Sequence, residues 1–146
     1  MSFTGVDSLD RGIHTTNRWL ADIATGFGTE DRRFAYRVLR AWSHTLRDRL
    51  TVEAAAHLAA QLPDPIRGMY YDGWNPSHVP HKYDVHEFAA RFADEAGIGR
   101  EDVPKAAAIV TEVVLFHVEP GAVAHAFGLM PIEIRALLQP GGGDSS

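Results

Sequence analysis

The sequence predicts an all-α protein in which two helical units of about four helices each pack as one globular domain. Apolar residues recur three and four positions apart over most of the 146 residues, which is the spacing of an amphipathic helix. Glycine, proline and capping residues interrupt this spacing repeatedly, as expected at helix ends. The β-branched stretch IVTEVVLFHV keeps the helical spacing, so no strand is expected.

Four helices are expected in the first half of the chain. The first has apolar residues four apart and ends at Gly28, after which Thr29 is positioned to cap the second. The same spacing predicts a long helix over residues 30–50. Thr51 begins a short third helix, and Asp64 caps a fourth that has proline in its first turn.

The second half of the chain contains the same kinds of residues that begin and end helices. Asp84 and Glu87 form the pattern of a capping box at the start of a helix. Another helix is predicted over 101–118. Three residues mark the remaining boundaries, Gly97 as a helix end and Pro120 and Pro131 as helix beginnings.

The two halves also resemble each other in sequence. HLAAQLPDPIRGMY matches HAFGLMPIEIRALL at an offset of 68 residues, and RWLADIATGFG matches EFAARFADEAG at an offset of 69. Similarity of this length predicts a tandem duplication. The expected segments are a flexible N-terminus over 1–13, a first repeat over 14–71, a connector over 72–84, a second repeat over 85–139 and a flexible tail over 140–146.

Four motifs of the first half occur together and in order. They are LRDRL at 46–50, LAAQLP at 58–63, RG at 67–68 and YYDGW at 70–74. In these motifs the chain resembles the bacterial domain of unknown function 2267, and the resemblance covers about residues 14–138. It implies an all-helical, duplicated, cytoplasmic domain. It implies no activity, since the family has no established catalytic residues to assign to this sequence.

Composition excludes several classes of protein. The chain has no cysteine, which excludes disulfides, thiol catalysis and thiolate metal sites. It has no apolar run near eighteen residues and no secretory signal pattern at its start, so we expect a cytoplasmic protein without a membrane partner. No nucleophile constellation, phosphate loop or dinucleotide motif is present. The sequence therefore favours a non-enzymatic protein and implies no cofactor.

The net charge of −5 is unevenly distributed. Residues 30–50 are rich in arginine, whereas residues 74–146 contain five basic and ten acidic residues. We expect the arginine-rich helix to be solvated or paired with the acidic second half. Because such a helix can also bind phosphate, Arg37 and Arg40 are candidate ligand-binding residues.

Three histidines raise the question of metal binding. His78, His81 and His86 lie within ten residues, and three imidazoles could bind zinc, nickel or iron. The alternative is a solvated polar loop. His57 and His125 occupy matching positions of the repeat, and we expect them to be hydrogen-bonded structural residues.

The connector combines large aromatic side chains with residues that interrupt helices. Tyr70, Tyr71 and Trp74 lie beside Gly73 and Pro76. These aromatic residues could form the rim of a small-molecule site together with the loop histidines. Alternatively they form a packed seam between the two repeats, in which Trp74 fixes the connector.

A non-enzymatic interaction or scaffold protein, which self-associates or binds a protein partner, is the function that the sequence favours most. An alternative is a small-molecule or metal-binding protein that uses residues 70–86. A second alternative is DNA binding by a helix-turn-helix over 122–138, with Ala124, Gly128 and Ile134 at its small, turn and apolar positions. The acidic second half repels phosphate, so nucleic acid is not expected as a partner.

Overall fold

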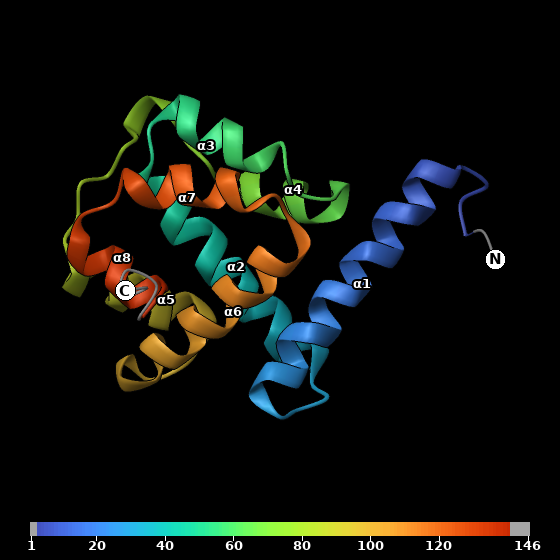
Figure 1. Ribbon diagram of the computed structural model, residues 1–146, viewed down its shortest axis with the longest axis horizontal. Helices are drawn as coiled ribbons and strands as arrows, with labels where there is room; N and C mark the ends of the chain where they lie inside the picture. The colour runs from blue at the N-terminus through green and yellow to red at the C-terminus, as the bar shows by residue number, and fades with distance from the viewer. Residues whose placement is uncertain (1–2, 141–146) are drawn as a thin grey trace.

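The computed structural model describes residues 3–140, and these residues form eight α-helices, two 3₁₀-helices and no strand (Figure 1). In chain order the elements are α1 (Asp7–Phe27), α2 (Arg32–Arg49), α3 (Val52–Ala59), α4 (Asp64–Tyr71), η1 (Pro76–His78), α5 (Val85–Ala96), η2 (Arg100–Asp102), α6 (Val103–His117), α7 (Pro120–Gly128) and α8 (Ile132–Leu138). The prediction of an all-α globular domain is confirmed for this part of the chain.

Several helix boundaries lie where local sequence predicts them. Gly28 and Gly97 end α1 and α5 with φ values of 71° and 70°, a left-handed conformation that favours glycine. Thr51 and Asp84 cap α3 and α5, because each side chain accepts a hydrogen bond from the backbone N–H three residues later. Short-range chemistry therefore sets these ends.

Two predicted caps are wrong by one or two residues. Asp31 rather than Thr29 caps α2, and its carboxylate accepts from two backbone N–H groups of the first turn. The Thr29 hydroxyl instead accepts from the N–H of Asp31. Pro63 is the N-cap of α4, so Asp64 is already the first helical residue. A carboxylate directly before the first turn reaches two donors at once, which favours Asp31 as the cap.

Helix α2 lies at the centre of the fold and packs against α1, α4, α5 and α6 (Figure 1). Its Trp42 is buried, and the indole Nε1–H donates a 3.0 Å hydrogen bond to Oγ1 of Thr111 in α6. The other largest buried side chains include Trp19, Tyr70, Phe88 and Phe92. These residues come from α1, α4 and α5 and belong to one hydrophobic cluster, so both halves of the chain contribute to a single core.

Helix α1 begins at Asp7, inside the segment 1–13 for which the sequence predicts a flexible N-terminus. It packs against α2, α4 and α6, with Gly12 beside Pro65 of α4, and its first turns project from the body of the molecule (Figure 1). The ring of His117 in α6 stacks on Trp19 of α1, and its Nε2 lies 2.7 Å from the carboxylate of Asp22. The predicted tail over 140–146 lies, apart from Pro140, outside the described residues.

A helix that crosses a membrane is both long and apolar. Among the helices of residues 3–140, none combines these two properties.

Candidate functional site

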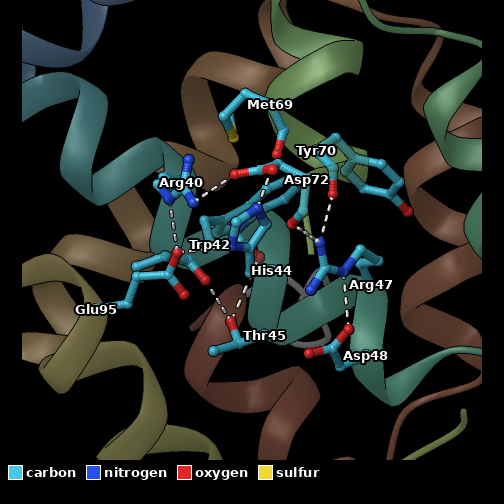
Figure 2. A network of polar contacts seen from close by, with 11 residues as sticks. Arg40, Trp42, His44, Thr45, Arg47, Asp48, Met69, Tyr70, Asp72 and Glu95 are labelled. Carbon is cyan, nitrogen blue, oxygen red and sulfur yellow. Dashed lines mark hydrogen bonds and ion pairs between the residues drawn. The ribbon is translucent and has the colours of Figure 1, made fainter. Parts of the chain in front are cut away.

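A row of polar side chains follows one face of α2. Arg37, Arg40, His44 and Arg47 succeed one another at spacings of three, four and three residues, which places them on the same side of the helix. His44 and Arg47 are buried, with only 7% and 4% of their surface exposed. Ionisable groups at this depth require partners, and Figure 2 shows that they come from α4, from Asp72 directly after it, from α5 and from Asp48 of α2 itself.

Arg47 holds the start of the connector against α2. Its Nη1 donates to the carbonyl oxygens of Tyr70 and Asp72, both at 2.8 Å, and its Nε donates to Asp48 at 2.7 Å. The two carbonyls lie at the C-terminal end of α4, where backbone acceptors lack partners within the helix. A cation there also interacts favourably with the helix dipole. Arg47 therefore fixes the direction in which the chain leaves α4.

His44 joins α2 to both α4 and α5. Its Nε2 lies 2.8 Å from the carbonyl oxygen of Met69, and its Nδ1 lies 2.6 Å from Oε2 of Glu95. Because a carbonyl oxygen can only accept, the Nε2 of His44 carries a proton and donates it. Arg40 donates from Nε to the same Glu95 oxygen at 3.1 Å. One carboxylate of α5 thus binds two side chains of α2.

Asp72 completes this network at the surface. Nη2 of Arg40 lies 2.9 Å from Oδ2 of Asp72. The hydrogen bond from Arg40 holds the pKa of Asp72 below its ordinary value, and the same bond raises the pKa of Arg40. Since the Asp72 side chain is 62% exposed, water screens this pair and its contribution to stability is small.

A cavity of about 180 Å³ adjoins the network between α2, α5 and the end of the connector. It is lined by His44, Thr45, Asp48, Tyr83, Arg91, Asp94 and Glu95. The Tyr83 hydroxyl donates to the carbonyl of Thr45, and the Arg91 guanidinium lies 4.7 Å from the Tyr83 ring centroid. Burial, followed by the charge of Asp48, raises the pKa of Tyr83. Of the three carboxylates in its wall, Asp48 and Glu95 are paired with basic side chains of α2, and the Arg91 guanidinium lines the same wall. The cavity therefore suits a small polar molecule.

The predicted aromatic residues of the connector pack against the protein rather than line this cavity. Tyr70 is fully buried and its hydroxyl donates a 2.8 Å hydrogen bond to the carbonyl of Ala55. Tyr71 and Trp74 are half-buried against the core, with ring centroids 5.2 Å apart. Nε1 of Trp74 is enclosed and has no hydrogen-bond partner in residues 3–140. The contacts named here all lie within residues 55–74, so a seam between the two repeats stays a prediction.

The two candidate arginines of α2 also contact α5. Nε of Arg37 donates to the carbonyl oxygen of Ala96 at 3.2 Å, and its guanidinium lies 5.5 Å from the Phe34 ring centroid. Arg40 pairs with Glu95, as described above, and so has the acidic partner in the second half that the charge distribution predicts.

The three loop histidines have different surroundings. Nδ1 of His78 lies 3.0 Å from the side-chain nitrogen of Asn75, the backbone N–H of His81 donates to the carbonyl of Asp48, and His86 is exposed on α5. Within residues 3–140 no group of three or more potential ligand side chains is arranged around one position for a metal ion. Metal binding by these three histidines stays a prediction.

The other two histidines differ from their prediction. His57 and His125 are exposed, and neither ring forms a hydrogen bond within residues 3–140. The interpretation as hydrogen-bonded structural residues is therefore wrong. The surrounding alanines are small enough to leave both rings in solvent while the helices behind them pack.

Five side chains of the network are absent from the predicted site residues: His44, Arg47, Asp48, Asp72 and Glu95. A signal for two of them is present, because His44 and Arg47 continue the spacing of Arg37 and Arg40 along α2. Glu95 gives no such signal, since an acidic residue near a helix end is also typical of an ordinary surface.

The chain was compared with known families and proteins. Residues 16–137 match the model of the family described as "Uncharacterized conserved protein (DUF2267)". No curated protein matches the chain. The matched range includes the whole polar network and every residue that lines the cavity.

Proposed function

The chain belongs to the DUF2267 family, and we propose that it is a non-enzymatic interaction module that self-associates through the N-terminal half of α1. The observation that carries this proposal is a row of exposed apolar side chains, Val6, Leu9 and Ile13, at the N-cap and in the first turns of that helix. These three residues are termed the α1 stripe below.

The α1 stripe continues the apolar face by which the rest of α1 packs into the core. From Val6 onward, apolar residues and Thr16 alternate at spacings of three and four up to Phe27, so they share one side of the helix. Ile23 is completely buried, whereas Val6, Leu9 and Ile13 are 48%, 45% and 39% exposed. Exposure therefore rises along this face toward the start of α1, where the helix still contacts α4 beside Gly12.

A second copy of the chain is the occupant that this stripe fits. Spacings that alternate between three and four are those of a coiled-coil seam. In an antiparallel pair of α1 helices, a two-fold axis brings Leu9 of each copy onto Ile13 of the other, which is the self-complementary contact of an isologous interface. Arg11 and Arg18 lie on the opposite side of the helix, so these two charges do not oppose the pairing.

Light scattering coupled to size-exclusion chromatography tests the proposal. The wild-type chain should form a dimer at high micromolar concentration, and Leu9→Glu combined with Ile13→Glu should make it monomeric. Ile132→Glu is the matched control, because Ile132 is 69% exposed on α8 and lies outside the stripe. A wild-type monomer at this concentration, or an unchanged dimer in the stripe variant, would contradict the proposal.

A second candidate function is the binding of a small polar molecule in the cavity beside His44. The polar lining of the cavity favours this function, and because acidic and basic side chains both line it, a small amine or zwitterion is the ligand class that it suits. A thermal-shift screen with amines and zwitterions tests it, with Asp94→Asn as the variant that should lose any hit. Screens without a hit, or a hit that Asp94→Asn retains, would count against it.

DNA binding by 122–138 is the third hypothesis. The segment lies in α7 and α8, of which α8 has only seven residues. A gel shift at low salt tests it, and we expect no bound duplex.

We also propose that the two halves are a tandem duplication. Support comes from helix contacts that correspond in pairs: α1 packs on α4 and α5 on α8, α2 packs on α4 and α6 on α8, and α2 packs on α5 and α6 on α1. The repeat-matched helices α3 and α7 contact each other, as do α2 and α6. This is the arrangement expected of two similar units around an approximate two-fold axis. Relatives whose halves lack any mutual similarity would weaken the proposal.

A further inference from the structure

Two histidines face each other on the exposed side of the contact between α3 and α7. The ring centroids of His57 and His125 lie 5.5 Å apart, with their planes inclined by 70°. Each side chain is exposed, and each belongs to a helix that is fixed by its packing on the other. Neither ring has a hydrogen-bond or ion-pair partner in residues 3–140. The nitrogen atoms of both rings are therefore free to bind a ligand from solvent.

The separation of the rings suits one metal ion bound by both. Zn–N bonds of about 2.0–2.1 Å at a tetrahedral angle place the centroids of two imidazole ligands about 5.2 Å apart. The observed 5.5 Å is close to this value. The outer torsion of a histidine side chain has a broad energy minimum, so two exposed rings can turn their nitrogens toward a common ion at little cost.

The chemistry of the pair selects the class of ion. Neutral imidazole is a ligand of zinc, nickel and copper, whereas calcium and magnesium prefer oxygen ligands. We propose that His57 and His125 form a two-histidine site for a divalent transition-metal ion, with water completing the coordination. This site is separate from the histidines of the connector and does not depend on self-association through the α1 stripe.

Metal binding at this position would join the two halves of the chain. His57 lies in the first half and His125 in the second, and α3 and α7 are the helices on which they meet. The unfolded chain does not hold the two rings together, so an ion that bridges them binds the folded state preferentially. The ion should therefore raise the midpoint of thermal unfolding.

Isothermal titration of the full chain with Ni²⁺ and with Zn²⁺ tests the proposal. We expect one site of micromolar affinity in the wild type. Removing one of two linked ligands should weaken binding by about tenfold or more, so His57→Gln and His125→Gln should each show this loss. The control replaces His78, His81 and His86 with glutamine and should bind as the wild type does. Added metal should raise the midpoint of thermal unfolding in the wild type and in the control, but not in His57→Gln or His125→Gln.

A spectroscopic measurement identifies the ligands directly. Paramagnetic Ni²⁺ should broaden the ring signals of His57 and His125 before those of the other histidines. Circular dichroism checks that the glutamine variants are folded, as expected for substitutions of exposed side chains. Absence of binding, equal affinity of the wild type and the His57→Gln variant, or loss of binding in the connector control would overturn the proposal.

Discussion

Replacing Arg47 with methionine tests whether this one side chain holds the connector to α2. Methionine fills a similar space but cannot donate, so the carbonyls of Tyr70 and Asp72 and the carboxylate of Asp48 lose their hydrogen bonds. Breaking a buried charged interaction by removing one partner costs about 3–5 kcal/mol. Because the Asp48 side chain is 23% exposed, water replaces part of its loss, and we expect the lower value of about 3 kcal/mol.

For a domain of this length, a loss of about 3 kcal/mol lowers the unfolding midpoint by about 6–12 °C. Urea denaturation followed by circular dichroism measures the free energy of unfolding. Arg33→Met is the control, since Arg33 is exposed on the same helix, and it should change stability by less than about 0.5 kcal/mol. Arg47→Lys keeps the charge without the planar fork and should be intermediate. Equal losses in Arg47→Met and Arg33→Met would refute the assigned role.

Three further predictions concern glycines, the connector and pH. Gly68→Ala should stabilise the protein by about 0.5–1 kcal/mol, because Gly68 lies inside α4 and an added Cβ meets no atom within 4 Å. Gly26→Ala should not stabilise it, since that Cβ would lie 2.7 Å from Cγ2 of Ile109; urea denaturation compares the two. In the same assay Trp74→Ala should destabilise by about 3 kcal/mol, because Trp74 packs on the core, and a loss below about 1 kcal/mol would contradict a seam. Burial raises the pKa of Tyr83, so above pH of about 10 the unfolded state releases the proton first. The contribution of Tyr83 to the free energy of unfolding is therefore complete below that pH and is lost as the pH rises further. Tyr83→Phe should remove this part of the loss of stability at alkaline pH, which is measured as ellipticity against pH.

The fold was largely predictable because helix ends depend on neighbouring residues. Gly28 and Gly97 end helices where the sequence places them, and Thr51 and Asp84 begin them. The errors have local causes too. Thr29 and Asp31 are both capping residues two positions apart, and only the three-dimensional turn decides which carboxylate or hydroxyl reaches the free N–H groups.

The candidate site was less predictable because it depends on distant residues. Glu95 follows His44 by 51 positions in the sequence, and it becomes the partner of His44 and Arg40 only when α5 packs on α2. The contact between His57 and His125 arises in the same way from the packing of α3 on α7. Repeat alignment relates those two positions but cannot reveal that they touch.

The hydrogen bond from Trp42 to Thr111 links the centre of α2 to the centre of α6 in the middle of the shared core. Both halves contribute side chains to that core, so we expect the chain to unfold in one cooperative transition. A cut within the connector, between residues 72 and 84, should leave two fragments that are unfolded apart and regain helical structure when mixed. In that case the covalent connection between the halves is not required for folding, and the contacts between the halves stabilise the protein.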